Sequence, residues 1–213
     1  MILSDKQLRE RIERGELVFP CKLEQINPAS VNLTLGNTFL TPMADDDVFL
    51  GDKVEYFRIE CEENERFATC FALKPGEFVL ATTREYVDVP DNLAAFVQGR
   101  SSIGRIGLTT QNAGFVDPGF HGHITLELVN ESPNTIILTP GYPVVQLVFF
   151  ECYPVEKPYA GKYNDQVEAT GSRMHLDRRG ECKWVETCRA SGEYLGKNGF
   201  CSRGERMDGE VSV

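Results

Sequence analysis

The stretch GFVDPGFHGHITLELVN, residues 114–130, sets the pattern from which the fold can be predicted. Apolar residues recur at every second position from Ile124 to Leu128, which is the period of a β-strand with one buried face. The segment 117–119, Asp-Pro-Gly, precedes this strand and has the composition of a tight turn, because proline presets φ and glycine accepts a positive φ. The alternation puts Glu127 on the face opposite the apolar residues, so a strand of the predicted core carries an acid at its centre.

Short strands separated by turns are expected on both sides of this stretch. Further turn signals occur at 74–77, 90–92 and 139–141. We expect strands at 31–35, 54–59, 67–73, 78–83, 86–89, 94–98, 108–110, 123–129, 135–138 and 144–150. Many short strands at this spacing are typical of a jelly roll, a sandwich or a barrel, and no long βαβ alternation points to a Rossmann-type site. The predicted fold class is therefore all-β.

One short helix is expected near the N-terminus. Ser4 and Gln7 have the spacing of a capping box, and Leu3 and Leu8 have that of a hydrophobic staple. Gly15 is placed to end the helix. We interpret this helix as structural.

Length and charge limit the architecture and the partners. A chain of 213 residues suits one domain with an appendage, and we predict a domain at 1–173, with a closing arm at 159–173, and a C-terminal extension at 174–213. The formal net charge of −10 argues against binding to nucleic acid or to an anionic membrane. The longest apolar run, 143–150, is too short to span a bilayer, and no secretory signal is visible, so we expect a cytoplasmic protein.

The cysteines favour free thiols over a disulfide framework or a zinc site. Their number is odd, and they are scattered at positions 21, 61, 70, 152, 182, 188 and 201. In a cytosolic chain such cysteines are expected to be reduced. His175 with the last three cysteines fits no standard zinc-finger spacing, so no zinc is expected.

Two features have the chemistry for a phosphorylated ligand. The segment 100–105, Arg-Ser-Ser-Ile-Gly-Arg, supplies guanidinium, hydroxyl and backbone N–H donors that suit phosphate oxygens, and successive amides could form an anion nest. A plain surface turn is the alternative. Glu127 would serve as a general acid and base in a partly apolar cleft, whereas a solvent-facing glutamate on an antiparallel strand is the other interpretation.

Two further segments could complete a nucleotide site. Small residues in 112–119 would let a ring or a sugar approach the backbone, and Asp117 is an acceptor for a sugar hydroxyl, although a hairpin turn explains the same residues. The segment 159–166 combines hydrogen-bond donors with aromatic surface in Tyr159, Lys162, Tyr163 and Gln166. It is either a disordered linker or a lid that closes over an anionic ligand.

Taken in order, these motifs resemble the dCTP deaminase branch of the dUTPase superfamily. The resemblance covers roughly residues 1–173 and rests on 2–5 (ILSD), 26–36 (INPASVNLTLG), 100–105 (RSSIGR), 116–120 (VDPGF), 126–128 (LEL), Gly141, 146–147 (QL), 158–159 (PY) and 162–166 (KYNDQ). It implies a distorted, dUTPase-like β-barrel that assembles into a homotrimer with sites between the subunits.

The resemblance also implies a role for each matching residue. Asp117 would hold the 3′-hydroxyl of deoxyribose, and Glu127 would be the acid and base of cytosine deamination. The pyrimidine edge would meet Thr125, Leu126 and Glu127, and the phosphates and base environment would meet Arg100, Ser101, Ser102 and Arg105. Gln146, Tyr159, Lys162 and Gln166 would hold the triphosphate, with Mg²⁺ bridging its oxygens and no direct protein ligand to the metal. Ser101, Arg105, Asp117 and Glu127 form the expected catalytic set.

Gly114 and Phe115, just before the Asp-Pro-Gly turn, belong to the expected substrate-binding set and favour the bifunctional type of this family. Such an enzyme deaminates dCTP, also accepts dUTP, and releases dUMP and diphosphate, with dTTP as a plausible feedback inhibitor. A deaminase that releases dUTP, a dUTPase alone, and a nucleotide-sensing binder without activity are the alternatives. The presence of Glu127 argues against the binder, since binding alone does not need the acid.

Overall fold

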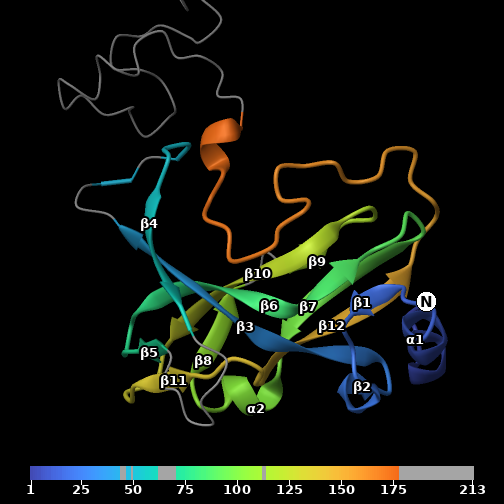
Figure 1. Cartoon of the computed structure of the whole chain (residues 1–213), viewed down its shortest axis with the longest axis horizontal. Helices are drawn as coiled ribbons and strands as arrows, with labels where there is room; N and C mark the ends of the chain where they lie inside the picture. The colour runs from blue at the N-terminus through green and yellow to red at the C-terminus, as the bar shows by residue number, and fades with distance from the viewer. Residues whose placement is uncertain (44–46, 49, 62–70, 112–113, 178–213) are drawn as a thin grey trace, which may run out of the picture. The chain divides into compact units, whose positions relative to one another are not determined.

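The computed structural model describes residues 1–43, 47–48, 50–61, 71–111 and 114–177 (Figure 1). The chain divides into two compact units, the first formed by Met1–Asp47 and Val54–Ser172, the second by Val48–Lys53 and Arg173–Val213. In the second unit the described part includes one 3₁₀ helix, η2 (Met174–Leu176). The predicted C-terminal extension falls in this unit and lies outside the described residues from 178 onward.

The first unit is built on a curled, mainly antiparallel sheet, which confirms the predicted fold class (Figure 1). Its strands are β1 (Leu17–Phe19), β2 (Ile26–Asn27), β3 (Ser30–Met43), β4 (Glu55–Glu60), β5 (Phe71–Leu73), β6 (Phe78–Asp88), β7 (Leu93–Gly99), β8 (Leu108–Gln111), β9 (Phe115–Val116), β10 (His121–Asn130), β11 (Ile136–Leu138) and β12 (Pro143–Glu151). The path β8-β10-β6-β3-β12-β7-β9 carries β1 on β6 and both β2 and β4 on β3, while β5 pairs with β11.

The strands β3 and β6 are much longer than the sequence pattern predicts, and three strands, β1, β2 and β9, were not predicted. The segments 78–83 and 86–89 form one strand, β6, and the strand expected at 31–35 extends over the whole of β3. Both are lengthened by cross-strand hydrogen bonds, since β6 pairs with β10 along most of its length and β3 pairs with β4 from Thr38 to Met43. The strands β1 and β2 are two or three residues long and show no alternation that could have indicated them.

The predicted turns and the N-terminal helix are present. Gly76, Gly119 and Gly141 have φ values of 77°, 89° and 79°, which only glycine adopts without strain. The helix α1 (Asp5–Ile12) begins after Ser4, whose backbone N–H donates to the amide oxygen of Gln7 at 2.9 Å. This bond is half of the predicted capping box.

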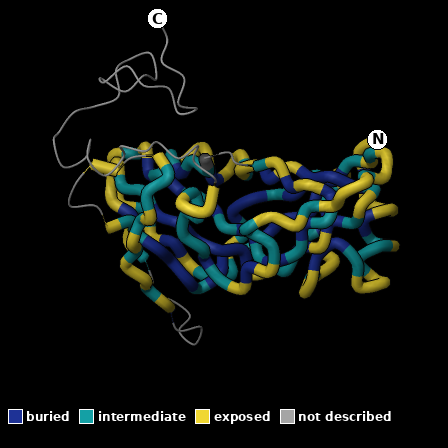
Figure 2. Tube along the Cα trace, turned by 90° about the horizontal axis from the view of Figure 1, so that it is seen from above, coloured by how far each residue is buried: buried dark blue, intermediate teal, exposed yellow. Residues whose placement is uncertain are grey.

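The inner faces of the sheet form one core, as the alternation in residues 124–128 predicts. Figure 2 shows the buried residues concentrated along the strands and the exposed ones at loops and ends. Strongly buried members of this core are Val31, Leu33, Leu35, Val79, Ala81, Leu126, Leu128, Val145, Leu147 and Phe149. A second, smaller apolar cluster lies apart from it and consists of Leu40, Leu80 and Ala169, with Tyr56 and Phe78 packed against them.

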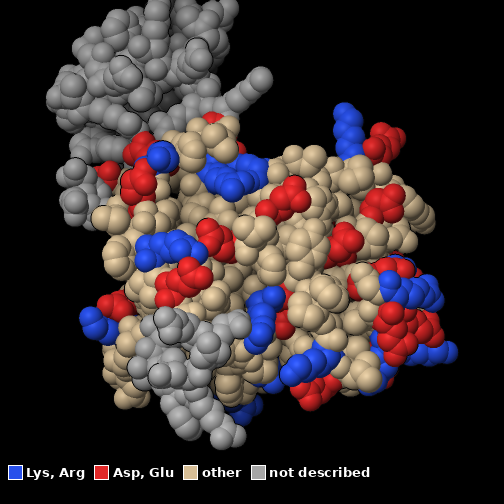
Figure 3. Space-filling view, in the orientation of Figure 1, with Lys and Arg blue, Asp and Glu red and all other residues tan. Residues whose placement is uncertain are grey.

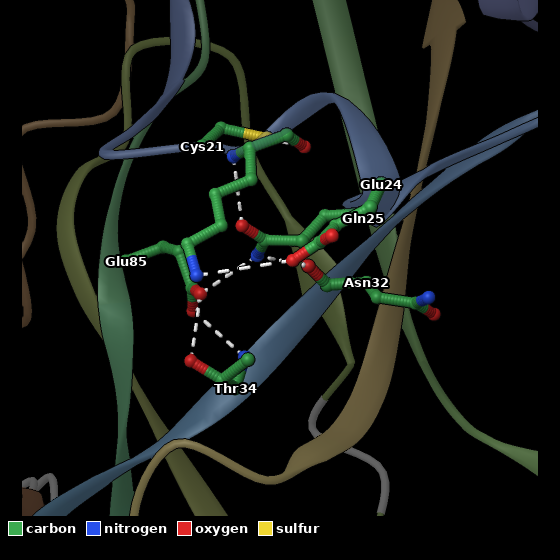
Figure 4. Close-up of polar contacts among 7 residues, drawn as sticks. Cys21, Glu24, Gln25, Asn32, Thr34 and Glu85 are labelled. Atoms are coloured by element: carbon green, nitrogen blue, oxygen red, sulfur yellow. Dashed lines mark hydrogen bonds and ion pairs between the residues drawn. The ribbon is translucent and has the colours of Figure 1, made fainter.

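A buried carboxylate connects β6 to β3 and to the 3₁₀ helix η1 (Leu23–Gln25) (Figure 4). Glu85 on β6 is only 3% exposed and accepts hydrogen bonds from the Thr34 backbone N–H at 2.8 Å and the Thr34 hydroxyl at 2.7 Å. The Gln25 side chain donates to Glu85 at 2.8 Å and to the Asn32 carbonyl at 2.9 Å. Backbone pairing between β3 and β6 runs from Leu40 only as far as Leu35, so the side chain of Glu85 holds the two strands together beyond that point.

The expectation of reduced thiols holds for Cys21 and Cys152 but is wrong for Cys61. Cys61 is disulfide-bonded, with its partner outside the described residues. Sequence spacing does not indicate which cysteines the fold brings within bonding distance, because a disulfide requires a specific pair geometry. Burial, and secondarily the charge of Glu85, raises the pKa of the Cys21 thiol to about 11, so this thiol is protonated at neutral pH.

On the face drawn in Figure 3, acidic and basic side chains are interspersed and do not gather into a patch of one sign. Among the described residues, no helix is long and apolar enough to cross a membrane.

Replacement of Glu85 by alanine is expected to lower the free energy of unfolding by about 3 kcal/mol, because it leaves the Thr34 and Gln25 donors without their acceptor. Urea denaturation at fixed protein concentration measures the change. Glu24→Ala is the matched control, since this side chain is 77% exposed and its ion pair with Lys22 is 3.8 Å long. A loss for Glu85→Ala no larger than that of the control would contradict the role given to this carboxylate.

Candidate active site

A cavity of about 430 Å³ lies on the outer side of β10, and several of the predicted site residues line it. It is open to solvent on one side and lined by β4, β6, β7, β9, β10 and the segment 159–172, called the arm below. The predicted site residues in its lining are Phe115, Asp117, Thr125, Glu127, Tyr159 and Gln166. The structure therefore brings together six residues that are up to 51 positions apart in sequence.

The strand β10 separates the predicted pyrimidine-edge residues onto two faces. Thr125 and Glu127 are half-buried and line the cavity, whereas Leu126 is 2% exposed and packs in the core. The side chain of Leu126 is thus turned away from the cavity, and only its backbone could meet a ligand there. The β10–β6 register shifts between His123 and Thr125, a bulge of the kind that re-aims side chains beside functional sites.

Glu127 lies in partly apolar surroundings. Its register partners are Leu80 on β6 and Gln111 on β8. Leu80 belongs to the small apolar cluster and lines the same cavity, as does Phe78. The cleft that the functional interpretation of Glu127 requires is therefore present.

The turn after β9 places Asp117 at the rim of the cavity. Asp117 is exposed, and its carbonyl accepts the Phe120 N–H at 3.1 Å. Phe115, half exposed at 51%, stands two residues earlier on β9. The hairpin turn and the candidate site, which were weighed as alternatives for this segment, therefore share residues. Of the segment 112–119, positions 112 and 113 lie outside the described residues.

The arm is docked on β9 and β10 in this structure, which does not agree with a disordered linker (orange, Figure 1). Its backbone makes one bond to the turn after β9, Tyr159 N–H to the Pro118 carbonyl at 2.7 Å. Two more bonds join it to β10: Asp165 N–H to the His121 carbonyl at 2.9 Å, and His123 N–H to the Gln166 carbonyl at 2.8 Å. Gly122 and Gln166 form an isolated parallel bridge. The His121 Nδ1 lies 3.0 Å from the Asp165 carboxylate.

Two glycines allow this docking because a side chain at either position would collide with the arm. A Cβ at Gly119 would lie 2.5 Å from Cβ of Pro158, and one at Gly122 would lie 2.9 Å from the backbone nitrogen of Gln166. Both glycines also have positive φ, 89° and 142°. The spacing of these glycines on β10 and its turn therefore sets where the arm can lie.

The side chains of Thr125 and Gln166 bind each other. The Thr125 hydroxyl donates to the amide oxygen of Gln166 at 3.0 Å and accepts the backbone N–H of Thr170 at 3.1 Å. Gln166 is 7% exposed. In this docked arrangement the Thr125 hydroxyl is engaged by the arm, and the Gln166 side chain lies inside the cavity wall.

The aromatic residues of the arm cover the rim beside Asp117. The Tyr159 ring packs 6.2 Å from that of Phe120, and its hydroxyl accepts the Tyr163 N–H at 3.3 Å. Tyr163 also lines the cavity, and Lys162 Nζ lies 5.4 Å from the Tyr163 ring centroid. Lys162 itself is outside the cavity lining.

The second group of predicted residues lies elsewhere on the chain. Residues 101–104 form a one-turn helix, α2 (Ser101–Gly104), at the bottom of the view in Figure 1, whereas the arm crosses the top. Ser101, Ser102 and Arg105 are exposed. The Arg100 guanidinium donates to the Pro143 carbonyl at 3.0 Å, and Gln146 on β12 accepts from the Ser30 hydroxyl at 3.3 Å.

Three amides of the segment 100–105 are engaged within the helix and are not available to an anion nest. The N–H groups of Ile103 and Gly104 donate to the Arg100 carbonyl at 2.9 and 3.0 Å, and that of Arg105 donates to the Ser101 carbonyl at 3.0 Å. The segment adopts helical hydrogen bonding, which uses these donors internally. Its guanidinium and hydroxyl groups remain the candidates for phosphate binding.

One sheet face connects the two groups. On β7 and β12 the outward residues Gln98 and Gln146 are register partners at one end, next to Arg100. At the other end Phe96 stacks on Phe150 at 5.2 Å and meets Phe115 of β9 at 5.3 Å. The face thus runs from the second group to the cavity rim and ends in exposed aromatic rings. Gly114, on the same edge, accepts the Val97 N–H with its carbonyl at 2.7 Å.

Several cavity residues were not predicted from the sequence. They are Tyr56, Phe78, Leu80, Val97, Val116, Phe120, Ile124, Thr170, Gly171 and Ser172. Phe120 lies inside the motif 116–120, so its neighbours in sequence could have indicated it, and Tyr163 was named as part of the arm. Tyr56 lies on the edge strand β4, and residues 170–172 lie at the polar end of the arm. No sequence pattern there indicates a ligand site.

Magnesium fits this chain as an ion carried by a phosphorylated ligand. The described part of the chain holds no group of three or more His, Cys, Asp and Glu side chains that could bind a metal by itself. Mg²⁺ that enters with substrate phosphates and keeps several waters needs no such group of protein ligands.

Comparison with known proteins identifies relatives over most of the chain. A family model described as dCTP deaminase-like matches residues 2–152. A protein of Persephonella marina named "dCTP deaminase, dUMP-forming" is 45% identical over 183 residues, covering 84% of this chain and 99% of the relative. A Sulfurihydrogenibium protein of the same name is 46% identical over 180 residues, with coverage of 84% and 99%.

A solved structure supports the fold. The crystal structure of 2′-deoxycytidine 5′-triphosphate deaminase from Agrobacterium tumefaciens superposes with a TM-score of 0.54 at 18% identity, over 70% of this chain and 48% of that chain. At this identity the similarity concerns the fold alone.

Gly122→Ala is expected to displace the arm, because the new Cβ would press on the Gln166 backbone. Trypsin should then cleave after Lys162 at least about tenfold faster than in the unchanged protein, in proportion to the undocked population. Gly76→Ala is the control, since Gly76 also has a positive φ, 77°, but nothing lies within 4 Å of the added Cβ. Equal cleavage rates in the two variants would show that strain alone, not contact with the arm, explains the effect.

Proposed function

The chain belongs to the dCTP deaminase-like family, and from that premise we propose that it is a dUMP-forming dCTP deaminase. It hydrolyses the C4 amino group of dCTP and also cleaves the triphosphate, giving ammonia, diphosphate and dUMP for dTTP synthesis. The observation that carries this proposal is the position of Glu127, half-buried in a partly apolar cavity whose rim holds Asp117. The names and the nearly full-length match of the relatives support the same reaction.

Deamination requires a proton to be taken from water and given to the leaving amine. The Glu127 carboxylate accepts a proton from the water that adds to C4, and the resulting acid donates it to the departing nitrogen, so that one C–O bond forms and one C–N bond breaks. Leu80 and Phe78 beside Glu127 exclude bulk water from this end of the cavity. Asp117 at the rim accepts the 3′-hydroxyl and so fixes the distance between the base and the sugar.

Triphosphate cleavage is assigned to the opposite end of the ligand. Arg100, Ser101, Ser102 and Arg105 bind phosphate oxygens with Gln146, Tyr159 and Lys162, and Asp117 orients the attacking water. When Mg²⁺ is bound with the triphosphate, it neutralises charge on the phosphate oxygens. Gly114 and Phe115 leave the backbone before the turn without a basic side chain, in agreement with the dUMP-forming type. Release of free dUTP, dUTPase activity alone and a binder without activity are less favoured by the relatives' names.

We propose that the site is completed between subunits of a homotrimer. On one chain, Arg100 and Gln146 lie outside the lining of the cavity that contains Glu127. The face with Phe96, Phe115 and Phe150 offers an aromatic contact that a second copy can cover. A cyclic arrangement then places the basic group of one copy at the cavity rim of the next, and every copy has the same environment.

Three further properties belong to this proposal. The catalytic domain spans 1–173, and 174–213 is an appendage to it. dTTP, which shares the deoxyribose and triphosphate of the substrate, competes for the same site as a feedback inhibitor. The protein acts in the cytoplasm, where its nucleotide substrates are found.

Glu127→Gln is expected to lower ammonia release from dCTP by at least about a thousandfold, since it removes the proton acceptor but keeps the shape of the side chain. Binding of dCTP, measured by calorimetry with Mg²⁺, should change less than about threefold. The assay follows ammonia, dUTP, dUMP and diphosphate from dCTP and from dUTP. Accumulation of dUTP from dCTP in the unchanged protein would refute the dUMP-forming activity, and an inert dCTP would refute the deaminase.

Mixed assemblies test whether a site is shared. Arg100→Ala and Glu127→Gln chains are each expected to be inactive alone, and co-refolding them in equal amounts should restore about a quarter of the sites, since one neighbour then supplies Arg100 and the other Glu127. A mixture of each variant with itself serves as the control. Failure to recover activity, with the trimer confirmed by light scattering, would place both residues in a site within one chain.

A further inference from the structure

The edge strand β4 holds the end of the arm through two contacts. The Ser172 backbone N–H donates to the Tyr56 hydroxyl at 3.0 Å. The Arg58 guanidinium donates to the Glu168 carboxylate at 2.6 Å and also pairs with Glu60 on its own strand at 3.0 Å. We call Tyr56, Arg58 and the segment 168–172 the latch. All of it belongs to the first unit.

Apolar packing and a glycine give the latch a defined position. Ala169 is 6% exposed and packs with Leu40 and Leu80, so the arm is inserted into the small apolar cluster. A Cβ at Gly171 would lie 2.4 Å from Cε2 of the Tyr56 ring, so that ring rests directly on the arm backbone. Tyr56 therefore contacts the arm with its ring and with its hydroxyl.

The latch is connected to the catalytic strand by one hydrogen bond. Thr170, between Ala169 and Gly171, donates its N–H to the Thr125 hydroxyl at 3.1 Å. Thr125 lies two residues before Glu127 on the same face of β10, and both line the cavity. Tyr56, Thr170 and Gly171 line it as well. The latch thus builds the cavity wall beside Glu127.

We propose that Tyr56 is a positioning residue for deamination. It holds the segment 170–172 so that the wall next to Glu127 keeps the base, and hence C4, in line with the carboxylate and its water. Arg58 and Glu168 assist by holding the other end of the same segment. The inference rests on the proposed function. The latch contains none of the residues assigned to the phosphates in the segment 100–105, which are Arg100, Ser101, Ser102 and Arg105. We therefore expect the latch to affect the reaction at C4 and not the cleavage of the triphosphate.

The two reactions of the proposed enzyme provide the test, because dUTP needs no deamination. Tyr56→Phe removes the acceptor of the Ser172 N–H and keeps the ring against Gly171. We expect kcat for ammonia release from dCTP to fall about tenfold, since a small displacement of a bound group is costly in rate. We expect kcat for diphosphate release from dUTP and the KM for dUTP to change less than about threefold.

Matched controls separate the latch from general effects of the substitutions. Tyr153→Phe removes the hydroxyl of a tyrosine that is 95% exposed and should change neither reaction. Glu168→Gln breaks the ion pair between β4 and the arm, whereas Glu60→Gln breaks the one within β4. Only Glu168→Gln should lower ammonia release, and by less than Tyr56→Phe, because exposed ion pairs are weak.

Two results would overturn the inference. Equal losses in both reactions of Tyr56→Phe would mean that the latch only stabilises the fold, and unchanged ammonia release would mean that the latch does not position the base. The failure of the proposed function is distinguishable from either, because the unchanged protein would then release no ammonia from dCTP.

Discussion

The docking of the arm on β10 is the constraint on which the site depends. Without it the cavity would lose Tyr159, Gln166 and the segment 170–172, which form one of its walls. The docking is permitted by Gly119 and Gly122, where any side chain would occupy the place of the arm backbone. A local property of two residues therefore decides whether Glu127 lies in a cleft or on an open sheet.

Behind the cavity, the sheet supplies the rigidity that such a cleft requires. β10 is an interior strand, paired with β6 on one side and with the end strand β8 on the other, and its inner face is part of the core. The Glu85 carboxylate replaces backbone pairing where β3 and β6 separate, so the strands remain connected on the side of η1. Buried acceptors of this kind are stabilising only when each donor is matched, and here three donors share one carboxylate.

The sequence predicted the parts of the fold that depend on local chemistry. The turns with glycine at positive φ, the capping box and the alternation of β10 are all of this kind. It failed where partners far along the chain decide, as in the full length of β3 and β6, the disulfide of Cys61, and the latch of Tyr56 on Ser172. For the site, motif residues on β9, β10 and the arm did meet in one cavity, whereas the Arg100 group did not, because no sequence pattern reports the distance between two faces of a sheet.

The arm is attached to its neighbours mainly by backbone groups, which leaves most of its side chains free to differ. The bonds of Tyr159, Asp165 and Gln166 to β10 and to the turn before it use backbone N–H and carbonyl groups, which every residue type except proline supplies in full. The position of the arm therefore does not depend on most of its side chains. The same backbone path can therefore carry different side chains, so changes at Lys162 or Tyr163 leave the path of the chain the same.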